Sequence, residues 1–492
     1  MTDRPRTGRP ETNGAADQAT LRAVVDRVRT SRGRDTVTSS TKVVDLEEFL
    51  AVEAVLNRRW PETKLAPSLD RIAALTDALG NPQQGYPVVH ITGTNGKTSV
   101  ARMIDTLLTE LGLRTGRYTS PHLQRATERI SLDNEPIRPE RYVELYREVE
   151  PFVDIVDARR GDGPELSKFE VLTAMAFAAF ADAPVEVGVV EVGMGGSWDA
   201  TNVVDGAVAV ITPVDVDHVD YLGADVTGIA REKAGIIKPG AVAVLAEQDP
   251  VVAQVLLERA TEVGAQVVRA GADFGVRKRE LAVGGQRLTL RGLSGEVEDV
   301  FLPLHGEHQA HNAAAALAAV EALIGANPEQ RLDPDTVRAA FDAVTTPGRL
   351  ERLAAGTGRP TVLCDSAHNP HGARALARAL RSEFRFERLV GVLSVMRDKD
   401  VTGMLTALEP VLHEIVITAN SSPRAMDPDE LAARAVEVFG EDRVIVETRF
   451  ADAVTQAEDA ARRGGDSGVG VVVTGSVVTA GDARTLYGKE PG

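Results

Sequence analysis

The stretch that most constrains the fold of this chain runs from Val88 to Arg102 and reads VVHITGTNGKTSVAR. It combines an apolar strand, a tight turn that contains Gly93 and Gly96, and a helix that begins near Lys97 and Thr98. In such a turn, backbone N–H groups surround phosphate oxygens while the positive end of the helix faces them. The lysine adds a point charge, and the threonine offers a hydroxyl to Mg²⁺. The full signature has another glycine where this chain has an isoleucine, so the segment predicts a shortened nucleoside triphosphate site.

Length and charge limit the remaining classes of protein. At 492 residues the chain is too long for one hydrophobic core, so we expect two or three domains. A net charge of -17 disfavours binding to nucleic acid or to anionic lipid. The single cysteine, Cys364, excludes an internal disulfide and a cysteine-rich zinc site. Since no apolar run has the length of a signal-peptide core or a membrane span, we expect a cytoplasmic protein without nucleic-acid or membrane partners.

The pattern of apolar runs divides the chain into three parts. Residues 1–42 carry few large apolar side chains and are expected to form a disordered tail. Residues 43–345 are expected to form a P-loop ATPase-like α/β domain with a mostly parallel sheet covered on both faces, to which antiparallel hairpins at 275–302 are appended. Residues 346–492 alternate strands and helices again, which predicts a second, Rossmann-like domain.

Individual elements follow from the same periodicity. In the first domain, strands are predicted at 185–191, 207–212 and 241–246, and helices at 46–58, 68–79 and 312–323. In the second domain, strands are predicted at 361–364, 389–393, 414–418 and 468–473, and helices at 373–384, 429–438 and 451–462. Ser68 is a candidate N-cap, and Gln309 and Asn312 could cap the helix that they precede or begin.

Polar side chains follow several of the predicted strands. Glu191 ends an apolar strand just before a glycine cluster, at the edge where parallel sheets bind ligands, and a buried carboxylate there needs a cation such as Mg²⁺. His218 follows the next strand, although a lone histidine is more often a structural hydrogen-bond partner than a ligand. Ser120 could lie near the phosphates or in a polar surface connection, and Lys233 could be an ordinary surface charge. Asp365 with His368 could form a simple turn after a strand.

The motifs taken together are more specific than any one of them. GTNGKTS, TSPHL, EVGMGG followed by DATN, DHVDYLG, EKAGI, GEHQAHNAA, PGRLE, DSAHNP and SVMRDKD occur in this order. The chain closely resembles the folylpolyglutamate synthase and dihydrofolate synthase family of the Mur ligase superfamily, and especially its actinobacterial members, from about residue 46 to the C-terminus. The resemblance implies ATP-dependent amide formation, through an acyl phosphate, between L-glutamate and the carboxylate of dihydropteroate or a reduced folate.

The resemblance also implies a role for each matching residue. Nucleotide binding falls to Thr94, Asn95, Gly96, Lys97, Thr98, Asn312, Arg349 and Asp365, with His368 beside them. Two Mg²⁺ ions are implied, with Ser120, Glu191 and His218 as ligands. Lys97, Lys233 and His218 are the implied catalytic residues, with Lys233 carried as a carbamate. The pterin substrate is implied to contact Ser167, Lys168, Phe169, Glu170, Trp198, Asp199 and Ala200.

Two details bear on the choice of substrate. Asp199 favours a bifunctional enzyme that accepts dihydropteroate as well as reduced folates. Ser197 stands where relatives often have arginine, which puts the contact to a substrate carboxylate in doubt. Ser422 to Arg424 are candidates for the glutamate site.

Three other interpretations compete with this one. A peptidoglycan-type Mur ligase needs a UDP-sugar-binding domain before the loop, and only about 45 structured residues precede Val88. A nucleotide-dependent switch or motor usually ends its metal-binding strand in aspartate, where this chain has Glu191. A silent binding protein is disfavoured because the phosphate, metal and lysine positions are all present. The sequence does not give the oligomeric state, and a monomer is our expectation.

Overall fold

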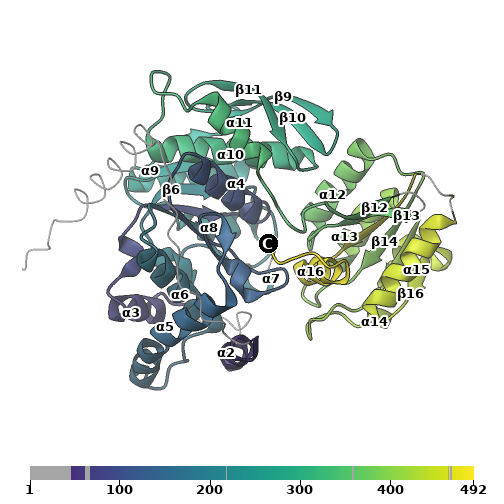
Figure 1. The fold of residues 1–492 in the computed structure, drawn as a ribbon, viewed down its shortest axis with the longest axis horizontal. Coiled ribbons are helices and arrows are strands. Elements are labelled where there is room, and N and C mark those ends of the chain that lie inside the picture. The colour runs from purple at the N-terminus through teal and green to yellow at the C-terminus, as the bar shows by residue number, and fades with distance from the viewer. Residues whose placement is uncertain (1–45, 61–66, 218, 357–358, 464, 466–467) are drawn as a thin grey trace, which may run out of the picture.

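The computed structural model describes residues 46–60, 67–217, 219–356, 359–463, 465 and 468–492. They form a first lobe of residues 46–342 and a second lobe of residues 351–492, which lie side by side (Figure 1). The tail predicted for residues 1–42 falls outside this described part. Every helix in the part of the chain that the structure describes is too short or too polar to cross a membrane.

An eight-stranded sheet is the centre of the first lobe. Its strands run in the order β4-β3-β2-β5-β1-β6-β7-β8, parallel except for β3 and β4, which pair antiparallel at one edge. The strands are β1 Val88–Thr92, β2 Thr115–Tyr118, β3 Ile130–Leu132, β4 Glu135–Pro136, β5 Val187–Glu191, β6 Gly206–Ile211, β7 Val242–Leu245 and β8 Gln266–Arg269. Because β1 lies between β5 and β6 and is buried along its whole length, the turn after it opens at the middle of the sheet edge.

Helices cover both faces of this sheet. Val89 and Ile91 pack with α4, α10 and α11 on one face, whereas Val88 packs with α2, α3, α5 and α6 on the other, as the alternation of side chains along a strand requires. A further cluster places α8 and α9 under β6 and β7. The helices are α2 Leu46–Arg58, α3 Asp70–Ala78, α4 Lys97–Glu110, α5 Pro139–Arg159, α6 Lys168–Asp182, α7 Val219–Leu222, α8 Val226–Ala234, α9 Pro250–Val263, α10 Glu307–Ile324 and α11 Pro334–Asp342.

The hairpins predicted at 275–302 form a sheet of their own. β9 Gly275–Ala282, β10 Gly285–Arg291 and β11 Glu296–Leu302 pair antiparallel and make no ladder with the large sheet. Leu288, Leu290 and Val300 point one face of this small sheet at α10 and α11, so the predicted antiparallel hairpins are joined to the first lobe by apolar packing on these helices. The antiparallel sheet is therefore layered on the helices (Figure 1).

Helix α10 begins earlier than the sequence predicts. Gly306, at a φ of 99°, is its N-cap, and the helix runs from Glu307. Gln309 and Asn312 consequently lie inside the first turns of the helix and do not cap it. Ser68 likewise precedes the N-cap of α3 by one residue, although its Oγ accepts a hydrogen bond from the backbone N–H of Asp70 (3.0 Å).

The second lobe contains a six-stranded sheet in the order β12-β13-β17-β14-β15-β16. Only β12, at the edge, is antiparallel in this sheet. The strands are β12 Glu351–Gly356, β13 Arg359–Cys364, β14 Arg388–Leu393, β15 Glu414–Ile417, β16 Val444–Val446 and β17 Val469–Thr474. The helices are α12 Pro370–Glu383, α13 Val401–Leu408, α14 Pro428–Phe439, α15 Phe450–Arg462 and α16 Val477–Leu486. The predicted fold class is confirmed, and the domain boundary at 345/346 stays a prediction.

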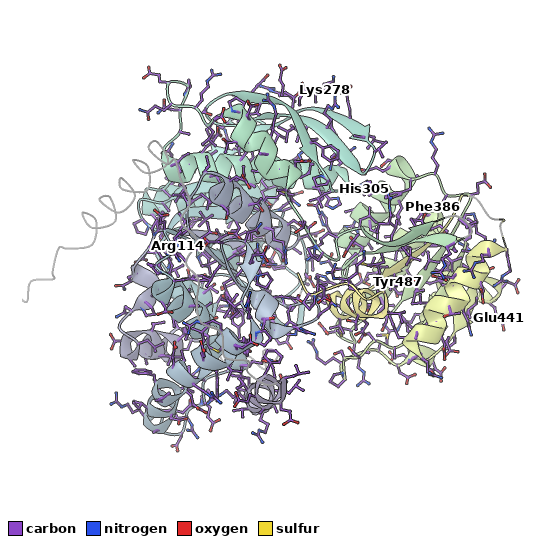
Figure 2. All side chains as sticks on the ribbon, viewed as in Figure 1. Arg114, Lys278, His305, Phe386, Glu441 and Tyr487 are labelled. Atoms are coloured by element: carbon purple, nitrogen blue, oxygen red, sulfur yellow. The ribbon has the colours of Figure 1, made fainter. Side chains whose placement is uncertain are left out.

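The end of α12 joins the second lobe to the first. Glu383 accepts hydrogen bonds from the backbone N–H of Gly306 (2.9 and 3.0 Å) and from His305 Nδ1 (3.2 Å), and it also contacts Arg279 of β9. The ring of His305 lies 4.7 Å from that of Phe384. Figure 2 marks His305 at this junction of the lobes, so the start of α10 is fixed by the neighbouring lobe as well as by its own glycine.

Candidate active site

The turn between β1 and α4 is tightly enclosed. Gly93 has a φ of 145°, and a Cβ built there would lie 1.9 Å from Thr212 Oγ1. Gly96 has a φ of 91°, and a Cβ there would lie 2.8 Å from Asn312 Oδ1. Both positions therefore require glycine, for conformation and for space. The positive end of α4 opens directly after the second glycine, at Lys97.

Two lysine side chains meet at the carbonyl of Gly93. Lys97 Nζ donates to this oxygen at 3.1 Å, and Lys233 Nζ, from the end of α8, donates to it at 2.9 Å. Burial lowers the pKa of Lys97, while Glu191 and Asp217 oppose the shift. Burial, helped by the neighbouring Lys97, lowers the pKa of Lys233 to about 7. The structure thus brings the Lys233 side chain to the phosphate loop, a contact that sequence spacing alone did not predict.

Oxygen donors gather where β5 ends. Thr98 Oγ1 donates to the carboxylate of Glu191, at 3.1 and 3.0 Å from its two oxygens, and the backbone of Ser120 donates to the same carboxylate. Burial raises the pKa of Glu191, and Lys97 opposes this. A carboxylate with two hydroxyl side chains nearby suits a hard cation such as Mg²⁺. His218 lies outside the described residues, and the part of the chain that the structure does describe holds no cluster of three His, Cys, Asp or Glu side chains able to bind a metal.

A cavity of about 380 Å³ opens on one side of the phosphate loop. Its lining includes most of the residues implied for the pterin substrate: Ser167, Phe169, Glu170, Trp198, Asp199 and Ala200. Ser167 caps α6 by accepting from the backbone N–H of Glu170 (3.1 Å), whose side chain accepts from the backbone N–H of Ser167 (2.7 Å). Lys168 points elsewhere, because its Nζ donates to Glu53 (3.0 Å) and Asn57 (2.8 Å) of α2.

A larger cavity of about 880 Å³ lies on the other side of the loop, between the two lobes. Its lining brings together Asn95, Gly96, Asn312, Arg349 and Asp365, all implied for the nucleotide. The loop residues Asn95 and Gly96, together with Arg349, line both cavities. The phosphate loop therefore stands where the two cavities meet, so that a nucleotide in one could reach a substrate in the other.

Asp365 shapes the turn that follows β13. Its carboxylate accepts from the backbone N–H groups of Leu350 (2.8 Å) and Ala367 (2.9 Å). Burial raises the pKa of Asp365, and Arg349 opposes the shift. The residue thereby holds the connection between the lobes against the second sheet.

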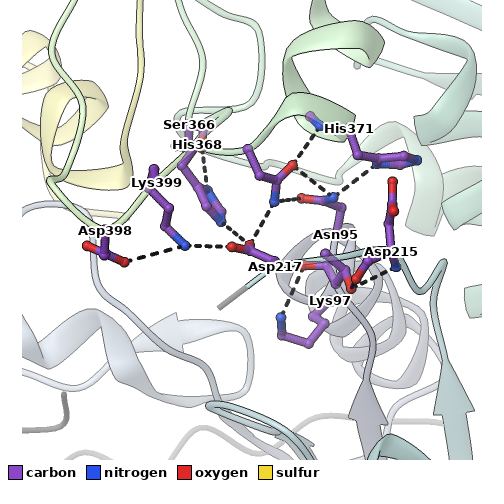
Figure 3. A network of polar contacts seen from close by, with 12 residues as sticks. Asn95, Lys97, Asp215, Asp217, Ser366, His368, His371, Asp398 and Lys399 are labelled. Atoms are coloured by element: carbon purple, nitrogen blue, oxygen red, sulfur yellow. Dashed lines mark hydrogen bonds and ion pairs between the residues drawn. The ribbon is translucent and has the colours of Figure 1, made fainter. Parts of the chain in front are cut away.

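A polar network crosses from the loop to the second lobe (Figure 3). Asp217 accepts from Lys399 Nζ at 2.7 Å and from Asn369 Nδ2 at 2.8 Å, and His368 Nε2 lies 3.4 Å from the same carboxylate. The amides of Asn95 and Asn369 are paired at 3.2 and 3.3 Å. The sequence had not singled out Asp217, Asn369 or Lys399 as site residues, since nothing local in the chain indicates that they meet.

Comparison with known proteins identifies the family. Residues 165–320 match the Mur ligase middle domain, and residues 348–477 match the glutamate ligase domain of Mur ligases. The chain is 57% identical over 478 residues to the dihydrofolate synthase/folylpolyglutamate synthase of Mycobacterium tuberculosis, an alignment that covers 92% of this chain and 97% of that protein. The chain belongs to the dihydrofolate synthase/folylpolyglutamate synthase family.

Solved structures of the dihydrofolate synthase/folylpolyglutamate synthase family match most of this chain. Folylpolyglutamate synthase of M. tuberculosis, complexed with ADP and AMPPCP, is 57% identical and matches with a TM-score of 0.86 over 91% of this chain and 100% of that chain. The Escherichia coli FolC structure in complex with DHPP and ADP is 28% identical, with a TM-score of 0.77 over 89% and 97%. The resemblance noted in the sequence is thus confirmed, and the protein is an ATP-dependent ligase of the Mur type.

Proposed function

We propose that the protein joins the α-amino group of L-glutamate to the carboxylate of dihydropteroate, and to that of reduced folates. The reaction is driven by conversion of ATP to ADP and inorganic phosphate. The observation that carries this proposal is the position of the phosphate loop between two cavities, with Lys97 and Lys233 at one carbonyl of the loop. Relatives solved with ADP and AMPPCP, with DHPP and ADP, and with AMPPCP and folate support binding of a nucleotide together with a pterin substrate.

The reaction has two steps. A carboxylate oxygen of the pterin substrate attacks the γ-phosphorus of ATP, and the bond from that phosphorus to the β-phosphate oxygen breaks. ADP is the leaving group, and the acyl phosphate stays in the smaller cavity. The glutamate amine then attacks the acyl carbon, a proton leaves the amine, and the tetrahedral adduct expels inorganic phosphate. Lys97 and the first N–H groups of α4 would hold the transferred phosphoryl group, which lets an anionic carboxylate approach an anionic nucleotide.

The metal ions belong at the end of β5. Ser120, Glu191 and His218 are the proposed Mg²⁺ ligands, with Thr98 nearby, and the oxygen donors of the described residues fit that ion. Bound Mg²⁺ would neutralise phosphate charge during transfer. Thr94, Asn95, Gly96, Asn312, Arg349 and Asp365 are proposed to hold the nucleotide itself.

Lys233 is proposed to carry a carbamate. This modification joins a neutral amine to CO₂ with loss of one proton, and a pKa of about 7 leaves roughly half of the amine neutral at that pH. Lys233→Ala should therefore lose activity and regain part of it with short carboxylic acids. Lys238→Ala is the matched control, because that lysine donates to Asn202 O (3.3 Å) away from the loop. Full activity of Lys233→Ala would refute the role.

The smaller cavity provides separate surfaces for the two ends of the substrate. Phe169, Trp198 and Asp199, on the first-lobe side, are proposed to bind the pterin ring. His368, Ser422 and Arg424, on the second-lobe side, are proposed to bind the incoming glutamate, whose carboxylates suit a cationic lining. Both cavities are built from one chain, so we propose a monomer as the active form, which sedimentation under assay conditions would test.

The decisive assay measures phosphate release from ATP with Mg²⁺ and L-glutamate. Release with both dihydropteroate and tetrahydrofolate supports the bifunctional synthase, and release with tetrahydrofolate alone restricts the proposal to polyglutamylation. Release that ignores both the pterin and glutamate would overturn the proposal. Product analysis by mass spectrometry should show the added glutamate.

A further inference from the structure

A buried histidine on β1 has no part in the chemistry described so far. His90 is fully buried, its Nε2 lies 2.9 Å from Thr201 Oγ1, and its Nδ1 has no hydrogen-bond partner among the residues that the structure describes. Burial, helped by Lys238, lowers the pKa of His90 to about 3, so the imidazole is neutral near neutral pH. One hydrogen bond is therefore all that distinguishes it from an apolar core residue.

The Thr201 hydroxyl that contacts His90 forms a second hydrogen bond, to Asp199. Thr201 Oγ1 lies 2.5 Å from Asp199 Oδ1 and donates to it. A hydroxyl has one proton and two lone pairs. Because the Thr201 hydroxyl donates its proton in the hydrogen bond to the carboxylate, it must accept a hydrogen bond from the imidazole. His90 is thereby held as the Nε2–H tautomer, and the chain of donors runs from His90 through Thr201 to Asp199.

The chain of donors ends in the smaller cavity. Asp199 is nearly buried, yet it lines that cavity beside Trp198. Backbone N–H groups of Thr201 and Met194 also donate to its two oxygens, both at 2.9 Å. The carboxylate is thus held by donors from Thr201, Met194 and Gly193 while the residue lines the cavity, and a hydrogen bond donated to Thr201 strengthens the one that Thr201 donates onward.

We propose that His90 and Thr201 are positioning residues for Asp199, and that they hold its carboxylate ionised and oriented to accept the ring N–H donors of a pterin. A 2-amino-4-oxopyrimidine edge offers two adjacent N–H groups, which match the two oxygens of a carboxylate only at one orientation. The inference rests on the function proposed above, and it extends the pterin subsite to the strand that precedes the phosphate loop.

The test compares variants that break the chain of donors with variants that keep it. Thr201→Val and His90→Leu break it, whereas Thr201→Ser and His90→Gln retain a donor at nearly the same place. Thr76→Val is the matched control, since its hydroxyl is equally buried but donates only to carbonyls of α3. Both tryptophans of the chain, Trp60 and Trp198, line the cavity, so quenching of intrinsic fluorescence reports binding of dihydropteroate without turnover.

We expect Thr201→Val to raise the Kd and the KM for dihydropteroate about tenfold and His90→Leu about threefold, with kcat and the KM for ATP unchanged. The two conservative variants and Thr76→Val should stay within about twofold of the wild type. His90→Leu should unfold at the same temperature as the wild type or higher, because an apolar side chain packs there without desolvation. If Thr201→Val fails to fold, His90→Leu alone tests the proposal.

Each alternative outcome has a distinct meaning. Wild-type affinity in Thr201→Val and His90→Leu, or equal loss in Thr201→Ser, would overturn the positioning role while leaving the synthase intact. A wild-type protein that neither binds dihydropteroate nor consumes it would overturn the proposed function and the pterin subsite together.

Discussion

Lys399→Met isolates the ion pair that joins the lobes across the active site. Lys399 Nζ lies 2.7 Å from Asp217 Oδ1, and the exposed fractions of the two side chains are only 8% and 7%. Methionine keeps the length of the side chain and removes its charge. The variant therefore leaves a nearly buried carboxylate with Asn369 and His368 as its remaining partners from the second lobe.

The magnitude follows from burial and from what remains. Removing one partner of a buried ion pair destabilises by about 3–5 kcal/mol. Asn369 still donates to Asp217 at 2.8 Å, and the cavity that Lys399 lines lets water approach. We therefore expect Lys399→Met to destabilise this arrangement by about 2–3 kcal/mol. If the pair holds the closed arrangement of the lobes, this energy appears as a loss of about 30- to 150-fold in kcat/KM for glutamate.

The assay is the initial rate of phosphate release, run beside thermal unfolding. Lys278→Met is the matched control, because Lys278 pairs with Glu280 at 3.1 Å on the surface, where such a pair is worth less than about 1 kcal/mol. Asp217→Asn and the double variant complete a cycle that measures the coupling between the two side chains. A coupling energy below about 0.3 kcal/mol would refute the role of this pair in closure.

Three further predictions use other parts of the site. Gly93→Ala should lower activity more than about a hundredfold, since its Cβ would lie 1.9 Å from an oxygen. Gly264→Ala is the control, at a φ of 68° with open space around it; it should lower the free energy of unfolding, measured by urea titration, by about 1 kcal/mol and leave activity unchanged. Burial raises the pKa of Asp199 to about 6, so its ionised form is lost as the pH falls through 6; the KM for dihydropteroate should then rise about tenfold per pH unit while the KM for ATP does not follow. Arg117→Met strands the fully buried Asp105, 2.7 Å from Arg117 Nη1, and should lower the free energy of unfolding by about 3–5 kcal/mol in urea titrations, most of which Arg117→Met/Asp105→Leu should restore.

Local patterns were enough to predict the parts of the fold that depend on local physics. The strand before the phosphate loop, the helix after it and the alternation in the second lobe follow from apolar periodicity and from glycine conformation. The small antiparallel sheet was also predicted, from alternating residues and glycine turns. Its packing partner was not, because the apolar face that it covers belongs to α10 and α11, which follow it in the chain.

Helix geometry explains why one implied substrate residue points away from the cavity. Ser167, Lys168, Phe169 and Glu170 are adjacent in sequence, but residues next to each other on a helix project about 100° apart. Lys168 faces α2 and binds Glu53, while its neighbours line the cavity. A motif transferred as a continuous run therefore includes a residue whose position is decided by the helix packed beside it.

The phosphate loop shows where a motif ends and the fold takes over. Its glycines are visible in the sequence, yet the reason that each must be glycine lies elsewhere: Thr212 after β6 crowds Gly93, and Asn312 of α10 crowds Gly96. The second lysine at the loop comes from α8, and the network around Asp217 joins residues up to 274 positions apart. Since these contacts form only when β1, β6, α8, α10 and the second lobe are assembled, binding of phosphate at this loop should be lost together with global folding and should not survive in a fragment that carries the motif alone.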